Sequence, residues 1–120
     1  MNTLERLRAI CLRLPGAEEY MMHGHPSFRA GKKPFVIAGE PGSPTVSIKV
    51  PLMDQPLYLE DPRFHRTHYI GQHGWITMTL EAEPDWAELE RLVVASYRLV
   101  AQKHMLKSLD ESGYLSTGKP

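Results

Sequence analysis

The 120 residues of this chain suffice for one domain with one hydrophobic core and are too few for two. Lys and Arg total 14, as do Asp and Glu, so the net charge is zero, which removes the whole-protein electrostatic argument for binding nucleic acid or an acidic membrane surface. A single cysteine excludes an intramolecular disulfide. No apolar run approaches the ~20 residues that span a bilayer, and charged residues interrupt the N-terminal stretch, so we expect a cytoplasmic protein without a membrane partner.

The first element is predicted to be a helix over residues 3–14. Its apolar residues recur at helical spacing: Leu4, Leu7, Ile10, Cys11 and Leu14. Asn2 has Glu5 three residues on, which is the spacing of a capping box, and Pro15 followed by glycine ends the helix. Cys11 lies on the apolar stripe, so we interpret it as a core residue rather than a catalytic thiol.

Consecutive short strands are predicted for residues 18–50. They are Glu18–Met22, Pro26–Ala30, Pro34–Gly39 and Thr45–Val50. A short turn around Gly31 and a polar loop over residues 40–44 join the later strands. Strands joined by such short links are antiparallel, because a parallel partner needs a long crossover. These strands therefore predict an antiparallel meander.

Two groups of histidines stand out. His23 and His25 precede a proline, and His65, His68 and His73 fall within nine positions of one another. A His-x-His pair on a strand would place both rings on one face, as metal ligands require, but the neighbouring glycines and proline favour loops. We therefore expect no metal site and no cofactor, and interpret these histidines as loop residues or partner contacts.

The stretch from Phe64 to Leu80 is the most informative part of the chain. Gly71 and Gly74 predict a tight turn that presents His73 before a strand over residues 75–80. Ile76, Met78 and Leu80 share one face of that strand, which leaves Trp75 on the other face. Trp75 is therefore expected either to be covered by another part of the chain or to belong to a contact surface. A short helix or turn is expected over residues 53–60.

A long amphipathic helix is predicted over residues 85–101. Asp85, with Glu88 three residues later, is a suitable N-cap. We expect one domain over residues 1–110, with an antiparallel sheet that carries the N-terminal and C-terminal helices on one face, and a flexible polar tail over residues 111–120. The side chains expected to be buried between them are Leu7, Ile10, Cys11, Ile48, Met78, Leu89 and Val93.

Several motifs, taken together in their order, resemble the MmcQ/YjbR family. They are Cys11-Leu12-x-Leu14-Pro15-Gly16, His23-Gly24-x-Pro26-x-Phe28-Arg29, Gly31-Lys32-Lys33-x-Phe35, Tyr69-Ile70-Gly71-x-x-Gly74-Trp75, Asp85-Trp86 and Ser96-Tyr97-Arg98-Leu99-Val100-Ala101. The resemblance covers roughly residues 4–109. It implies an α+β fold likened to frataxin-type and secretion-chaperone-type sheets, and DNA binding through a "double wing" without an enzymatic reaction. Relatives often carry Ala-Pro-Lys where this chain has Ala101-Gln102-Lys103, so the last helix is expected to continue through Leu106.

Two functions are compatible with these features. In the first, DNA phosphates contact the basic residues Arg29, Lys32, Lys33, Lys49, Arg63 and Arg66. In the second, a small ligand or a protein docks on an aromatic and histidine surface formed by His23, His25, Tyr69, His73 and Trp75. We expect no enzymatic activity, because no nucleophile–base pair, phosphate loop or metal signature is present in the sequence.

Overall fold

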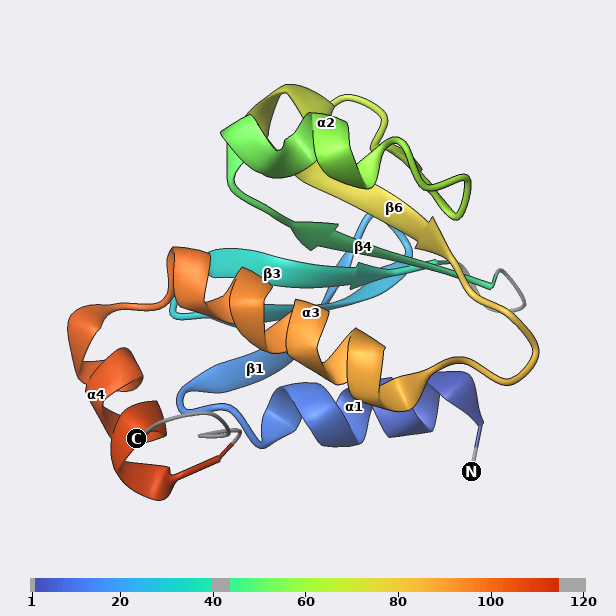
Figure 1. Ribbon diagram of the computed structural model, residues 1–120. Helices are drawn as coiled ribbons and strands as arrows, with labels where there is room; N and C mark the ends of the chain where they lie inside the picture. Colours follow the sequence, from blue (N-terminus) through green and yellow to red (C-terminus); the bar gives the residue numbers. More distant parts are fainter. Residues whose placement is uncertain (1, 40–43, 115–120) are drawn as a thin grey trace.

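Six strands form one antiparallel sheet in the computed structural model, which describes residues 2–39 and 44–114 (Figure 1). Their order across the sheet is β1-β2-β3-β4-β6-β5. The strands are β1 (Ala17–Met22), β2 (His25–Ala30), β3 (Lys33–Ala38), β4 (Thr45–Lys49), β5 (Phe64–Arg66) and β6 (Trp75–Thr79). The predicted α+β class and the antiparallel sheet are thereby confirmed.

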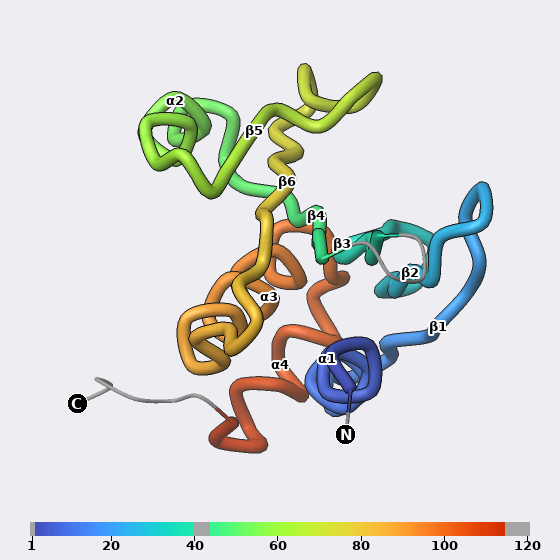
Figure 2. The backbone as a smooth tube through the Cα atoms, turned by 90° about the vertical axis from the view of Figure 1, so that its right-hand side faces the viewer, coloured from blue at the N-terminus to red at the C-terminus, as the bar shows by residue number. Residues whose placement is uncertain are grey.

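The helices α1 (Thr3–Leu12) and α3 (Trp86–Val100) cover the same face of the sheet, as predicted (Figures 1 and 2). Both begin at the expected caps: the Asn2 side chain and the Glu5 side chain bond each other's backbone N–H groups, and Asp85 accepts a bond from the Glu88 N–H. The short α2 (Gln55–Tyr58), preceded by the 3₁₀ turn η1 (Leu52–Asp54), lies at the β5–β6 end of the sheet.

One hydrophobic core fills the space between the sheet and these helices. The residues predicted to lie there do so: Leu7, Cys11, Ile48, Met78, Leu89 and Val93 are buried, and Ile10 packs against them half-buried. Burial raises the pKa of the Cys11 thiol well above its usual range, so this side chain is an inert core residue. Each of the fully buried Leu, Ile, Val and Met side chains stabilises the fold by about 2 kcal/mol through burial.

The predicted meander is correct from β1 to β4, but the order of the strands differs beyond β4. β6 pairs with β4, and β5 pairs with the outer edge of β6, so the sheet order departs from the chain order. β5 was not predicted, because its three residues are too few for the alternation of apolar and polar side chains to be detected.

A bulge in β3 brings Phe35 into contact with α3. Phe28 pairs with Val36 and Arg29 with Pro34, so Phe35 is the extra residue of β3. Its ring is buried and makes an edge-to-face contact with Tyr97 of α3, with centroids 5.4 Å apart. Its carbonyl accepts a hydrogen bond from the Ser96 hydroxyl, which in turn accepts one from the Lys49 N–H.

The prediction that the last helix continues through Leu106 was wrong. α3 ends at Val100, Ala101 and Gln102 have extended backbones, and a separate helix, α4 (Lys103–Ser112), follows. The break lets Met105 and Leu109 turn inward and pack on the core, with the Met105 side chain against Gly16. α4 covers part of the expected tail, and residues 115–120 lie outside the described residues.

Candidate functional site

The sheet face opposite α1 and α3 carries a cavity of about 720 Å³, here called the open-face cavity. Figure 2 shows the β1–β2 turn and the segment after β5 projecting from this side of the sheet. The cavity lies between these two projections, and its floor is the sheet itself. Its apolar lining comes mainly from Met22, Ile37 and Ile70. The volume falls within the range of small-molecule pockets.

Three hydroxyls form a chain across the floor. Residues on this face alternate with the core residues, so Ser47 of β4 and Thr77 of β6 lie directly opposite each other in the register. Their oxygens are 2.8 Å apart, and the Thr77 oxygen is 2.9 Å from the Thr67 oxygen. Ser47 and Thr77 are nevertheless only 8 % exposed. The floor is thus polar and held in place by its own bonds.

Four imidazoles surround this floor. His23 and His25 come from the β1–β2 projection, and His65 and His68 come from β5 and the segment after it. The rings of His65 and His68 have centroids 6.2 Å apart. The Nδ1 atom of His25 is buried and has no hydrogen-bond partner among the described residues, which is uncommon for a buried polar atom.

Backbone strain occurs on both rims of the cavity. Among the described residues, only His23 and Tyr69 have positive φ angles without being glycine, at 50° and 69°. Both line the open-face cavity, from opposite sides. Such conformations are costly for residues with a Cβ atom and concentrate at functional sites. The strain therefore marks the same place as the cavity does.

The predicted aromatic and histidine surface is only partly assembled. His23, His25 and Tyr69 line the cavity, whereas His73 and Trp75 do not. Trp75 is 5 % exposed, so the expectation that another part of the chain covers it is the correct alternative. His65 and His68, which were interpreted as loop residues or partner contacts, also line the cavity. The floor hydroxyls were not among the predicted site residues, although the alternation of Thr77 with Ile76 and Met78 places Thr77 on the non-core face.

The six basic residues of the DNA hypothesis lie on both sides of the sheet. Lys32 and Lys33 are exposed at the β2–β3 turn. Arg29 pairs with Glu18 and stacks on the Tyr20 ring, and the Arg66 side chain lies against Gly71. Lys49 is half-buried opposite Trp75.

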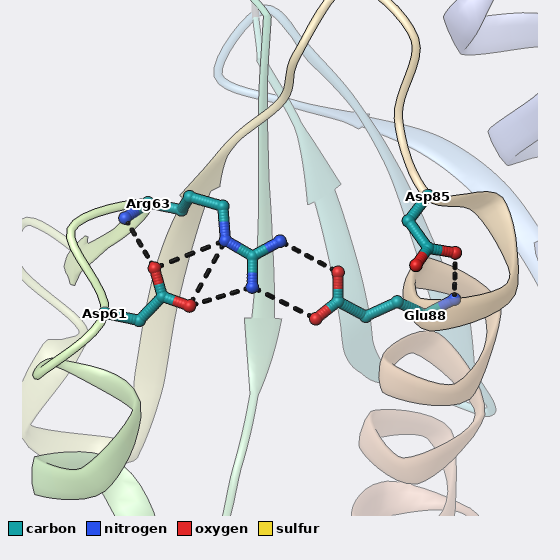
Figure 3. A network of polar contacts seen from close by, with 4 residues as sticks. All are labelled: Asp61, Arg63, Asp85 and Glu88. Atoms are coloured by element: carbon teal, nitrogen blue, oxygen red, sulfur yellow. Dashed lines mark hydrogen bonds and ion pairs between the residues drawn. The ribbon is translucent and has the colours of Figure 1, made fainter.

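Arg63 is held on the helix side of the sheet by two carboxylates (Figure 3). Its guanidinium lies 2.8 Å from both Asp61 and Glu88, and these bonds raise the pKa of Arg63 and lower that of Asp61. Because the two negative charges outnumber the single positive one, the surroundings of Arg63 do not attract phosphate.

Possible metal ligands were compared across the residues that the structure describes. No three His, Cys, Asp or Glu side chains there are grouped so as to hold a metal ion. Over the same residues, no helix combines the length and apolar character needed to cross a membrane.

Comparison with protein-family models identifies the family. The family model described as YjbR matches residues 12–99, which include the sheet and most of α3. No curated protein matched the chain.

Proposed function

The chain belongs to the YjbR family, and we propose that it is a non-enzymatic binding module that holds a small, mostly apolar ligand in the open-face cavity. The observation that carries this proposal is the coincidence of the cavity with the two strained residues, His23 and Tyr69, on its opposite rims. At His23 the positive φ also suits the two-residue hairpin between β1 and β2, whose favoured turn needs positive φ at both loop positions. At Tyr69 no such hairpin accounts for it, and strain at an exposed residue is typical of a binding site that must keep its rim in a fixed position.

The composition of the walls supports binding more than catalysis. The apolar side chains would remove a ligand's hydrocarbon surface from water, which contributes about 25 cal/mol per Å². The floor hydroxyls are held in place by their own hydrogen bonds, and such fixed polar groups orient the ligand in most small-molecule sites. Ser47 and Thr77 are bonded to each other rather than to a base, so neither hydroxyl is activated as a nucleophile.

A fluorescent, uncharged aromatic probe tests the proposal. N-phenyl-1-naphthylamine gains fluorescence in apolar surroundings, and we expect saturable binding to the wild-type protein with one site per chain. Ile37→Trp places an indole on the cavity floor and should abolish this binding. The matched variant is Met53→Trp, which adds the same indole to an exposed position outside the cavity and should leave binding unchanged.

Two results would contradict the proposal. The first is the absence of saturable binding by the wild-type protein to this probe and to its sulfonated analogue. The second is equal binding by both variants, which would place the probe elsewhere. Circular dichroism melting of each variant separates loss of the site from loss of the fold.

Duplex DNA is the second candidate ligand, and the exposed Lys32 and Lys33 favour it. Lys103 lies beside them in a cavity of about 670 Å³ between the β2–β3 turn and the start of α4. These three ammonium groups would contact phosphates without reading sequence. The pairing of Arg29 and Arg63 with carboxylates weakens this candidate.

Titration of a fluorescent duplex at about 50 mM salt tests the DNA candidate. If DNA binds there, affinity should fall steeply with salt, by a log–log slope of about −0.9 for each contacted phosphate. Changing Lys32 and Lys33 together to Glu should abolish binding while the fold stays intact, because both are exposed turn residues. No wild-type binding, or equal binding by the variant, would rule out the candidate.

A further inference from the structure

We infer that the ligand of the open-face cavity is an organic anion, whose apolar part lies against the sheet and whose charged group is received by the side chains of His65, Thr67 and His68. The inference rests on the proposed function and adds the chemical class of the ligand. Three properties of the walls carry it: their charge, their hydrogen-bond donors and the position of those donors.

Charge on the walls excludes one class of ligand. Among the described residues that line the cavity there is no Asp, Glu, Lys or Arg, and the ionisable side chains are four imidazoles and the Tyr69 phenol. A cationic ligand would meet no carboxylate among these described residues, and a charged group taken from water without a partner is costly. An anion meets imidazoles, whose N–H groups can donate hydrogen bonds to it.

The hydroxyl chain on the floor leaves one donor for a ligand. Ser47, Thr77 and Thr67 carry one hydroxyl proton each, and the two bonds between them use two protons. The third proton is left on Ser47 or Thr67, or on Thr77 where its oxygen accepts both bonds, and all three residues line the cavity. An acceptor atom of the ligand would satisfy it. The nearby imidazole rings offer further N–H donors.

The position of these donors separates the two ends of the ligand. Thr67 lies between His65 and His68 in the chain, and all three line the cavity from the segment that begins with β5. Of the apolar residues, Met22 and Ile37 come from β1 and β3, toward the opposite side of the sheet, whereas Ile70 follows the donor segment itself. The side of Met22 also carries His23 and His25, but no hydroxyl of the floor chain. A ligand with its acidic group at Thr67 therefore extends its hydrocarbon part across the floor.

An entering anion favours the cationic form of an imidazole beside it. The ionisable groups that share the cavity with His65 and His68 are His23 and His25 from the β1–β2 projection and the Tyr69 phenol, and the Arg66 side chain lines a second hollow together with His68. Because no fixed charge lies among the described lining residues, the imidazoles are the groups that can balance an entering anion. The affinity for an anion should therefore rise as pH falls, whereas the affinity for an uncharged molecule of the same shape should not.

Two probes that share one skeleton test the inference. 8-Anilinonaphthalene-1-sulfonate carries the aromatic system of N-phenyl-1-naphthylamine together with a sulfonate. At about pH 6, the sulfonated probe should bind the wild-type protein at least about tenfold more tightly than the uncharged probe, and this preference should shrink toward about pH 8. Changing His65 and His68 together to Gln, which keeps a donor but cannot take up a proton, should remove the preference for the sulfonated probe over the uncharged one.

The matched control changes His73 and His104 together to Gln. Neither residue lines the cavity, so the preference should persist. The inference is overturned if the uncharged probe binds at the cavity as tightly as the sulfonated one, or if the preference survives the change of His65 and His68. In either case the proposed function stands, provided that Ile37→Trp still blocks the uncharged probe. If neither probe binds the wild-type protein, the proposed function and the inference fail together.

Discussion

Ser96→Ala should destabilise the protein far more than the loss of one hydroxyl suggests. Ser96 is fully buried, and its oxygen lies 2.7 Å from the Phe35 carbonyl and 2.9 Å from the Lys49 nitrogen. Alanine would leave one backbone acceptor and one backbone donor without a partner, each at a cost of about 1–3 kcal/mol. Removing the hydroxyl also relieves the cost of burying it, so we expect a net loss of about 3 kcal/mol in the free energy of unfolding.

Chemical denaturation in urea measures this loss, and a melting temperature lower by about 10 °C should accompany it. The matched control is Ser108→Ala on the exposed side of α4, which should change the free energy of unfolding by less than about 0.5 kcal/mol. If Ser96→Ala is as mild as the control, Ser96 does not support the bulge of β3, and the reasoning is refuted.

Three further changes test other parts of the fold. Trp75→Ala should cost about 3 kcal/mol in urea denaturation, since the ring is buried, and an unchanged midpoint would show that the ring is dispensable. Gly74→Ala should cost more than about 2 kcal/mol in the same assay, because a Cβ at its φ of +97° would lie 2.4 Å from the Val50 carbonyl oxygen; a native midpoint would contradict this. Hydrogen bonds from Arg8 lower the pKa of Glu19, so Glu19 stabilises the fold at neutral pH, and this contribution disappears as pH falls through the lowered pKa. The melting temperature of Glu19→Gln should therefore fall less between neutral and acid pH than that of the wild-type protein, and an identical dependence on pH would contradict this.

Local signals in the sequence were sufficient for most of the elements. The cap spacings at Asn2 and Asp85 correspond to the hydrogen bonds that begin α1 and α3. Alternation of apolar residues identified β4 and β6, and short links identified antiparallel pairing from β1 to β4. The buried side of each element follows directly from its periodicity, which is why the predicted core is correct.

The missed features depend on contacts between distant parts of the chain. The break at Ala101 and Gln102 contains neither proline nor glycine, and it is stabilised by the packing of Met105 and Leu109 on the core. The cavity forms because the strained turns at His23 and Tyr69 face each other across the sheet, which no local pattern encodes. His73 adjoins the same strand, but its turn directs it away from the cavity.

The insertion of β6 between β4 and β5 makes the steps of folding unequal in rate. The pairs β1–β2 and β2–β3 join residues close together in the chain, such as Met22 with His25, whereas β4–β6 joins Lys49 with Trp75. Closing a longer loop costs more chain entropy before any contact offsets it. The β1–β3 part should therefore form early, and the pairing of β4 with β6 should limit the folding rate. Because the Ser47–Thr77 bond crosses that late pairing, the floor of the open-face cavity is completed among the last steps of folding.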